Sequence, residues 1–259
     1  MNNFSLKSLI PFYTLVKREV GRFMLVPIQT VIPSLITTLL YVLIFGFTLG
    51  SRIQEISGVP YIVFIVPGLV MLNVITAAYA NSSSSMTISK YMRNLENILI
   101  APVSYFEFAM AYVIGAAARG FIVGIGTLII AALFIDVTIH SIALSILITF
   151  LASVSFASLG LIIGIWADNF DQVSIFPTFI LTPLTFLGGV FYSIELLPEL
   201  FRNISLLNPI FHVVNTFRFS ILGITDFNFG ISFLVTIVLT LVPLIWAIYL
   251  LKIGYKIKD

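Results

Sequence analysis

The stretch PLTFLGGVFYSIELLPELFRNISLLNPIFHVVNTFR, residues 183–218, decides which fold this chain can adopt. It begins as an apolar run, breaks at Gly188-Gly189, and continues as an amphipathic segment too polar to span a bilayer. Membrane proteins keep broken, partly polar backbone at membrane level only where protein or a water-filled cavity shelters it. The stretch is therefore the main indication of function in the sequence.

The composition shows that a membrane surrounds that stretch. Of the 259 residues, 59% are hydrophobic and 9% are charged, whereas soluble domains carry about 25% charged residues. Cysteine is absent, which excludes disulfides, thiolate metal sites and cysteine nucleophiles. The net charge of +2 is too small to indicate a nucleic-acid partner.

Six apolar stretches are long enough to cross a bilayer, which takes about 20 residues per helix. They are residues 26–50, 59–86, 108–135, 141–166, 173–193 and 227–251. Residues 195–223 are amphipathic and broken, so we expect a re-entrant helical hairpin there, joined at Asn208-Pro209, before the last span. The sequence thus predicts an all-α membrane protein with one domain over residues 1–259.

The distribution of positive charge predicts the orientation of these spans. Six spans place both termini on one side, and that side holds nine lysines and arginines against three on the other. Both termini are therefore predicted to be cytoplasmic. The nine are Lys7, Lys17, Arg18, Arg22, Lys90, Arg93, Lys252, Lys256 and Lys258, and the three are Arg52, Arg202 and Arg218.

Two amphipathic segments lie on the predicted cytoplasmic side. Residues 5–23 alternate an apolar and a basic face at helical spacing, which predicts an interfacial helix, or else an ordinary basic flank of the first span. Residues 90–101 predict a short helix that Pro102 ends. Its charges have mixed sign, which favours a groove in a partner protein over a lipid surface.

Arg119 is the only charge predicted deep within a span, and such charges are functional candidates. Small residues from Gly115 to Gly126 surround it and let helices approach closely. Arg119 can therefore contact substrate, or can be a structural arginine that pairs with a carbonyl or carboxylate. Conceivable carboxylate partners are Glu107, Asp136 and Asp168.

Prolines and polar groups recur in the second and fifth predicted spans. Prolines loosen a helix, and polar groups on bendable helices suit the wall of a moving cavity. They also suit plain interhelical hydrogen bonds, worth about 0.6–2 kcal/mol each. The residues that we assign to a candidate substrate path are Asn73, Thr76, Thr178, Thr182 and Thr185.

Common catalytic signatures are missing from the sequence. It has no Gly-x-x-x-x-Gly-Lys-Ser/Thr loop for ATP, no Gly-x-Ser-x-Gly and no His-Glu-x-x-His. The serine run 82–85 is expected to cap the end of the second span. An intramembrane protease would need Ser82 or Ser155 with His140 or His212, which the predicted topology opposes, and a passive channel is the other alternative.

Several motifs resemble the permeases of the ABC-transporter type-2 family. The resemblance covers nearly the whole chain and rests on the combined pattern, since any single piece is weak. The motifs are Pro67-Gly68, residues 91–102 with Arg93-Asn94, Ala118-Arg119-Gly120, Phe176-Pro177-Thr178, residues 181–184, residues 187–193, Leu197-Pro198 and Leu207-Asn208-Pro209.

The resemblance implies a permease subunit of an ATP-driven exporter in the bacterial inner membrane, working by alternating access on a hydrophobic or amphipathic substrate. A second copy of the chain and two ATP-binding cassette subunits, which carry the ATP and magnesium, are the implied partners; no cofactor is expected on this chain. Residues 5–23 and 90–101 would contact the ATPase, with Arg93, Asn94, Leu95, Glu96 and Ile98 as coupling residues. The outer gate would comprise Gly188, Gly189, Pro198, Asn208 and Pro209.

Overall fold

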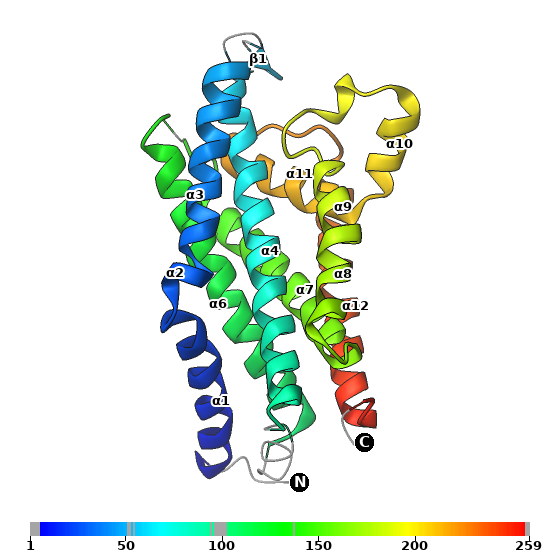
Figure 1. The fold of residues 1–259 in the computed structure, drawn as a ribbon. Coiled ribbons are helices and arrows are strands. Elements are labelled where there is room, and N and C mark those ends of the chain that lie inside the picture. Colours follow the sequence, from blue (N-terminus) through cyan, green and yellow to red (C-terminus); the bar gives the residue numbers. More distant parts are fainter. Residues whose placement is uncertain are drawn as a thin grey trace.

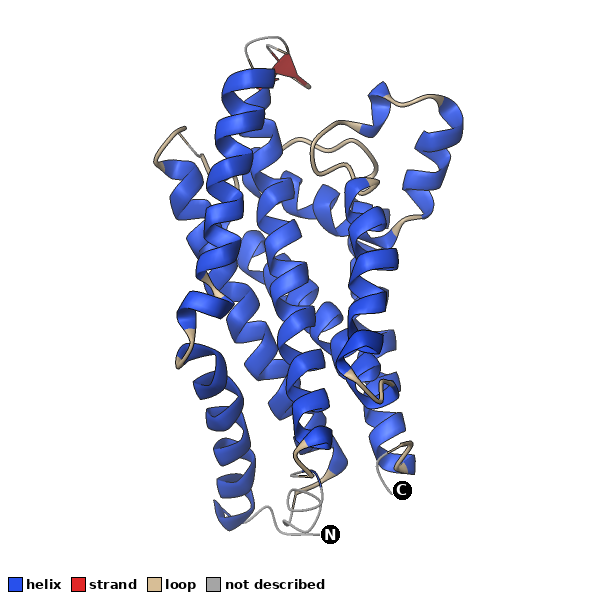
Figure 2. Ribbon diagram, viewed as in Figure 1, coloured by secondary structure: helices blue, strands red, loops and turns tan. Residues whose placement is uncertain are grey.

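The computed structural model describes residues 6–50, 53, 55–93, 95, 103–136 and 138–256. This part of the chain is almost entirely helical and forms an elongated bundle (Figure 1). Strand occurs there only as the antiparallel pair β1 (Glu55–Ile56) and β2 (Val59–Pro60), at one tip of the bundle (Figure 2). The start of the first helix and the end of the last lie at the opposite end, called the terminal end below.

Four helices are long and apolar enough to cross a membrane. They are α4 (Tyr61–Tyr91), α6 (Tyr105–Ala132), α7 (Ile142–Trp166) and α12 (Phe229–Ile253). The prediction of an all-α membrane protein is confirmed at this level. α4 is the most buried of the four, because α6 and α7 both pack along it. At Gly160 of α7 a side chain would collide with Ser82 and the carbonyl of Tyr79, so glycine permits this close approach.

The first and fifth predicted spans are segmented. Residues 26–50 form α2 (Pro27–Thr30), α3 (Ile32–Tyr41) and the π-helix η1 (Val42–Leu49). Residues 173–193 contain the end of α8 (Phe170–Phe176), the π-helix η2 (Pro177–Leu181) and α9 (Thr182–Phe186). Proline opens α2 and η2 and lacks the N–H that a continuous α-helix would use, which accounts for breaks there.

α1 (Leu6–Met24) agrees with the helix predicted over residues 5–23. The expectation that serines 82–85 cap a helix end is wrong, because α4 continues to Tyr91 and places them inside the helix. α4 therefore also includes Lys90 and Tyr91, which are the first two residues of the predicted coupling helix. Beyond Arg93, the structure describes only Leu95 of that predicted helix.

The segment before α12 consists of η3 (Ile194–Leu196), α10 (Glu199–Leu207) and α11 (Pro209–Leu222). The predicted junction of two helices at Asn208-Pro209 is confirmed: the Asn208 side chain accepts a hydrogen bond from the Ile210 N–H, 3.0 Å, and Pro209 begins α11. α11 lies across the bundle, away from the terminal end (Figure 1), and packs against α4, α7 and α12. Arg218, counted above among the positive charges on the side opposite the termini, is fully buried in α11.

Candidate functional site

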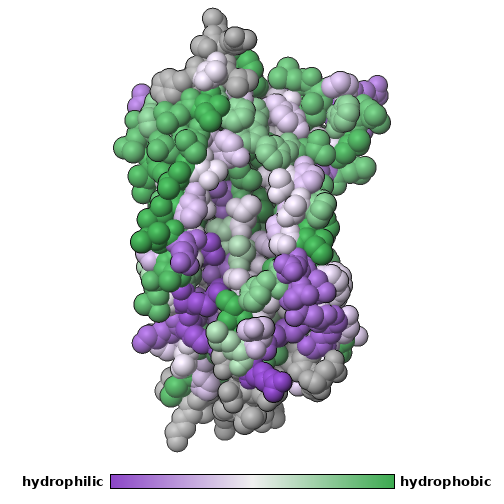
Figure 3. Space-filling model, viewed as in Figure 1, coloured by the Kyte–Doolittle hydropathy of each residue, from purple (hydrophilic) through white to green (hydrophobic). Residues whose placement is uncertain are grey.

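A groove with a cavity of about 310 Å³ lies between α3, α4 and α9. Figure 3 shows a hollowed strip of pale, weakly polar residues on this face, between more apolar green flanks. None of the described residues that line the groove carries a charge. They are Pro33, Ser34, Thr37, Tyr41, Leu72, Asn73, Thr76, Thr182, Thr185 and Phe186.

The structure brings together four of the five residues predicted for a substrate path. Asn73 and Thr76 come from α4, and Thr182 and Thr185 from α9. The fifth, Thr178, is exposed on η2 and does not line the groove. Sequence reasoning missed the α3 side, where Ser34 and Thr37 follow Pro33 at helical spacing and repeat the proline-plus-hydroxyl pattern seen in α9.

The threonine hydroxyl groups of the groove are tied to their own helices. Thr76 donates to the Leu72 carbonyl at 2.8 Å, and Thr185 donates to the Leu181 carbonyl at 2.6 Å. Thr182 donates to the Pro177 carbonyl at 2.8 Å, five residues back, in the register of the π-helix. Because each hydroxyl proton is used within the helix, the oxygen lone pairs remain to accept hydrogen bonds in the groove.

Asn73 anchors the base of the groove. Its side-chain amide donates to Thr38 Oγ1 of α3, 2.6 Å, and to Thr127 Oγ1 of α6, 3.0 Å. Asn73 is almost fully buried, so these bonds hold three helices in register and do not present the amide nitrogen to a ligand. The arrangement therefore combines both interpretations that the sequence left open: interhelical hydrogen bonds, and one wall of a cavity.

Arg119 is bound to the backbone at the break between α2 and α3. Its Nε and Nη2 both donate to the Thr30 carbonyl, at 3.1 and 2.7 Å. None of the ion pairs formed within the described residues involves Arg119, so the carboxylate partners considered above are not used there. The break between α2 and α3 leaves the Thr30 carbonyl without its usual partner in a continuous helix, and the two hydrogen bonds from Arg119 satisfy it.

A polar cluster that the sequence did not indicate joins α1 to the bundle. Glu19 is fully buried and accepts a 2.5 Å hydrogen bond from Ser85 of α4. Its carboxylate lies 3.3 Å from Arg18 and 4.0 Å from Arg22, and Arg22 also donates to the Asn81 carbonyl at 2.6 Å. A side chain at Gly115 of α6 would collide with Glu19, so this glycine makes room for it.

The terminal ends of three helices meet around Asp168. Its carboxylate accepts a 2.8 Å hydrogen bond from Lys256 and lies 4.0 Å from Lys90. The hydrogen bond from Lys256 lowers the pKa of Asp168 below its ordinary value of 3.8. Among the predicted coupling residues, Arg93 is exposed with a left-handed φ of 54° and Leu95 is buried, while Asn94, Glu96 and Ile98 lie outside the described residues.

A buried ion pair organises the opposite end of the bundle. Arg218 Nη1 lies 3.3 Å from Asp226 Oδ2, and Nη2 donates to the Gly189 carbonyl at 2.5 Å. The guanidinium carbon stands 4.0 Å above the ring of Phe64 in α4. Gly189 has a left-handed φ of 68°, which glycine adopts without strain. One arginine thus connects the Gly-Gly break, α11, α4 and the segment that leads into α12.

Two more of the predicted outer-gate residues lie at the two ends of α10. The Asn208 amide donates to the Leu184 carbonyl of α9 at 2.6 Å, so the junction between α10 and α11 is fastened to the fifth segment. Pro198 immediately precedes α10. Gly188, Gly189, Pro198, Asn208 and Pro209 therefore all belong to one linked region.

The serine–histidine pairings of a protease are not formed in the described part of the chain. Ser82 donates to the Ala157 carbonyl at 2.6 Å, and Ser155 donates to the Leu151 carbonyl at 2.7 Å. His212 does lie 3.0 Å from the Ser232 hydroxyl, but both side chains are buried. A substrate has no access to that pair.

Comparison with known proteins places this geometry in a family. A family model described as ABC-2 type transporter matches residues 11–222. The inner membrane transport permease YadH of Escherichia coli (strain K12) is 45% identical over 221 residues, which are 85% of this chain and 86% of that protein.

More distant similarity extends to nodulation proteins. Nodulation protein J of Rhizobium meliloti (strain 1021) is 25% identical over 199 residues, 76% of each chain. Nodulation protein J of Sinorhizobium fredii (strain NBRC 101917 / NGR234) is 25% identical over 174 residues, 67% of this chain and 66% of that protein.

Proposed function

The chain belongs to the ABC-2 type transporter family, and from that premise we propose that it is the permease subunit of an ATP-driven exporter. The substrate is hydrophobic or amphipathic and crosses the inner membrane by alternating access. The observation that carries this proposal is the uncharged groove between α3, α4 and α9, which offers hydroxyl oxygens beside apolar walls.

The proposed topology has six crossings with both termini in the cytoplasm. α4, α6, α7 and α12 supply four of them, and the segmented runs α2–η1 and α8–η2–α9 supply the other two. Because Arg218 is buried, it no longer counts among the positive charges of the outer connections. Nine lysines and arginines then lie on the side of the termini and two on the other side, which supports cytoplasmic termini. α1 then lies at the cytoplasmic interface, and α10 and α11 form the re-entrant hairpin on the outer side.

The groove is half of the proposed path, and a second copy of the chain closes it. α3 and α9 leave large apolar side chains exposed next to it, among them Ile36, Leu40 and Phe186. Contact with a second groove would cover such side chains and enclose the hydroxyl groups between two subunits. Segmented helices suit this role, since π-turns and prolines leave backbone groups that can change partners.

Two ATP-binding cassette subunits, with ATP and magnesium on those subunits, are the proposed partners on the cytoplasmic side. Arg93, Asn94, Leu95, Glu96 and Ile98 are proposed to transmit the motion of the ATPase to α4. α4 is well placed for this, because it carries Asn73 and Thr76 of the groove and also packs against α11 near the outer gate.

The relatives support the permease role, but their names specify neither the direction of transport nor the cargo. YadH carries the printed name of a transport permease, and the NodJ proteins that of nodulation proteins. The test is reconstitution of the chain in vesicles with the ATP-binding subunit that co-purifies with it. Substituting Arg93 and Glu96 together should abolish the coupling of ATP hydrolysis to transport, whereas Arg202→Glu on α10 should not.

Two outcomes of the same assay would refute the proposal. Unchanged ATP-driven transport by the Arg93/Glu96 variant would remove the coupling role. Substrate conductance by the chain alone, without an ATP-binding subunit, would identify a passive channel.

A further inference from the structure

A second cavity, of about 420 Å³, lies at the terminal end of the bundle between α7, α8–η2 and α12. It shares no lining residue with the groove. Both tryptophans of the chain line it, together with Tyr255. The full set is Ile162, Ile163, Trp166, Gln172, Ile175, Phe176, Ile180, Trp246, Leu250 and Tyr255.

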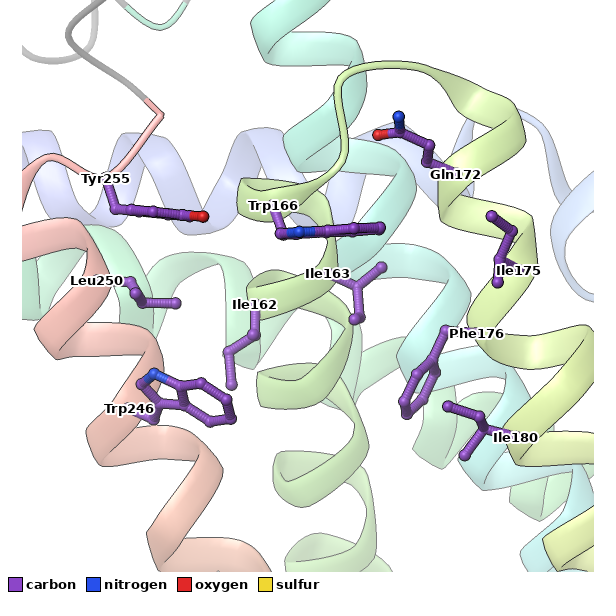
Figure 4. Close-up of a pocket in the computed structure, with 10 residues that line it drawn as sticks. All are labelled: Ile162, Ile163, Trp166, Gln172, Ile175, Phe176, Ile180, Trp246, Leu250 and Tyr255. Atoms are coloured by element: carbon purple, nitrogen blue, oxygen red, sulfur yellow. The ribbon is translucent and has the colours of Figure 1, made fainter.

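The lining is ordered along the cavity. In Figure 4 the rings of Trp166 and Tyr255 and the Gln172 amide lie toward one end, and Trp246 and Phe176 lie toward the other. Aliphatic side chains occupy the space between the two ends (Figure 4). The Gln172 amide and the Tyr255 hydroxyl thus lie at one end, and the rest of the lining is apolar except for the indole N–H of Trp246.

The position of the aromatic residues sets the depth of the cavity in a bilayer. Trp166 is the last residue of α7 and Tyr255 follows the end of α12, and such residues prefer the membrane–water interface. Trp246 precedes the end of α12 by seven residues, which puts it about 10 Å deeper. The cavity therefore runs from head-group level into the hydrocarbon region.

The cavity opens sideways toward lipid. Trp246 is 53% exposed and Ile175 is 48% exposed, although both are apolar and lie at bilayer depth. The volume falls within the range of small-molecule pockets, about 300–1,000 Å³. A flexible hydrocarbon chain from the surrounding leaflet has both access to this space and the chemistry to fill it.

Charges of both signs surround the polar end. Lys256 donates to the Trp166 carbonyl at 2.9 Å and to Asp168 at 2.8 Å, and its ammonium lies 5.7 Å from the Trp166 ring. Gln172 accepts a hydrogen bond from the Asp168 N–H at 2.8 Å. The carboxylate of Asp171, adjacent to Gln172, is exposed and pairs with no cation in the described part of the chain. This rim complements a head group that carries both a phosphate and an ammonium.

We propose that this cavity binds one zwitterionic phospholipid, with an acyl chain between α7, η2 and α12 and the head group at the rim. Its ammonium faces Asp171 and its phosphate lies on the side of Lys256. The site would fasten α8 and η2, on the flank of the groove, to α7 and α12. It depends only on the chain being embedded in a membrane and stands apart from the proposed transport activity.

The two tryptophans make binding directly measurable. The purified full-length chain in detergent is titrated with phosphatidylethanolamine brominated in one acyl chain, and tryptophan fluorescence is recorded. Bromine quenches the indole on contact, so we expect saturable quenching with a plateau near one lipid per chain. The Trp166→Phe variant, which keeps the deeper Trp246, should be quenched strongly, and the Trp246→Phe variant, which keeps Trp166 at head-group level, should be quenched less.

Matched variants separate the cavity from the general lipid surface. Ile163→Phe fills the cavity and should weaken binding about fivefold or more, and Ile175→Phe provides the same test at a more exposed position where folding is not at risk. Leu241→Phe, on an exposed part of α12 outside the cavity, should leave binding unchanged. Asp171→Asn should reduce the preference for phosphatidylethanolamine over brominated phosphatidylglycerol by about two- to fivefold, the size expected for an exposed charge pair.

Three results would overturn the proposal. The first is quenching that rises linearly with brominated lipid and never saturates. The second is an equal response of the Ile163→Phe, Ile175→Phe and Leu241→Phe variants. The third is equally strong quenching by a brominated fatty acid, which would show that the head group makes no contribution.

Discussion

Ionic clusters near the two ends of α4 hold neighbouring segments by different physical means. Near its start, Phe64 lies beneath Arg218, whose charge is balanced by Asp226 in a fully buried setting. Near its end, Ser85 binds the buried Glu19, whose partners Arg18 and Arg22 remain partly exposed. The first cluster fastens α11, and the second fastens α1.

The difference indicates which connection opens more easily. Separating Arg218 from Asp226 leaves an uncompensated charge inside the protein, whereas Glu19 and its partners Arg18 and Arg22 all belong to α1 and leave the bundle together. We therefore expect α1 to detach from the bundle more readily than α11. For a transporter driven from the cytoplasmic side, the more weakly held end would be the one that receives the mechanical input.

The largest predicted effect comes from Arg218. Arg218→Met should lower the free energy of unfolding by about 3–5 kcal/mol, because Asp226 is left buried without a partner and the contacts with Gly189 and Phe64 are lost. Thermal unfolding in detergent measures the loss. Arg202→Met on exposed α10 is the control, and equal losses in the two variants would mean that the buried cluster has no special role.

A smaller effect is expected at the other cluster. Glu19→Ala should cost about 1.5–3 kcal/mol, because it removes the charge-assisted bond from Ser85 but leaves arginines that reach solvent. Limited proteolysis of α1 reports its detachment, with the exposed Lys17→Ala as the control. A larger loss of stability in Glu19→Ala than in Arg218→Met would show that the cluster at α1 is held more firmly than the one at α11.

Substitutions in the groove should lower the free energy of unfolding by less than those in either ionic cluster. Asn73→Ala removes the bonds to Thr38 and Thr127 and should cost about 0.6–1.7 kcal/mol, typical of interhelical hydrogen bonds in membranes.

Thr182→Val should leave stability almost unchanged, since its hydroxyl bonds only within its own segment, but should alter transport. Loss of stability in Thr182→Val without a change in transport would argue against the groove as the path.

The smallest expected effect is a dependence of stability on pH that arises from Asp168. The pKa of Asp168 is lowered in the folded chain, so its contribution to stability is present above the ordinary value of 3.8 and is lost as pH falls through the folded value. Asp168→Asn should remove this acid sensitivity, which melting temperatures between roughly pH 3 and 6 would record. An identical pH profile in the variant would show that the bond from Lys256 does not contribute.

Local patterns predicted much of the architecture. The long apolar runs gave α4, α6, α7 and α12 to within a few residues, except that α4 extends beyond the serine run. Asn208-Pro209 predicted a helix junction, because an Asn cap and a Pro at the first helical position act locally. Four of the five residues predicted for a substrate path line one groove, and their assignment to a path stays a prediction.

The remaining features depend on contacts between distant parts of the chain. No local pattern singles out Glu19, because its partner Ser85 lies 66 residues away. The sequence placed Arg218 on the side opposite the termini, and only the packing of α11 shows that it is buried and paired with Asp226. The π-helix η2 begins at Pro177, but no proline marks the π-helix η1 in the sequence.

The sequence by itself determined that the chain is an all-α membrane protein of the ABC-2 type transporter family. Hydrophobicity and the spacing of proline, glycine and asparagine are properties of neighbouring residues, and they specify membrane helices and their breaks. Only the tertiary structure decided which polar groups face the groove, which charges are buried as pairs, and where the lipid-facing cavity lies. Those outcomes depend on the partners that packing supplies, and in a low-dielectric interior the partner decides whether a polar group can be buried at all.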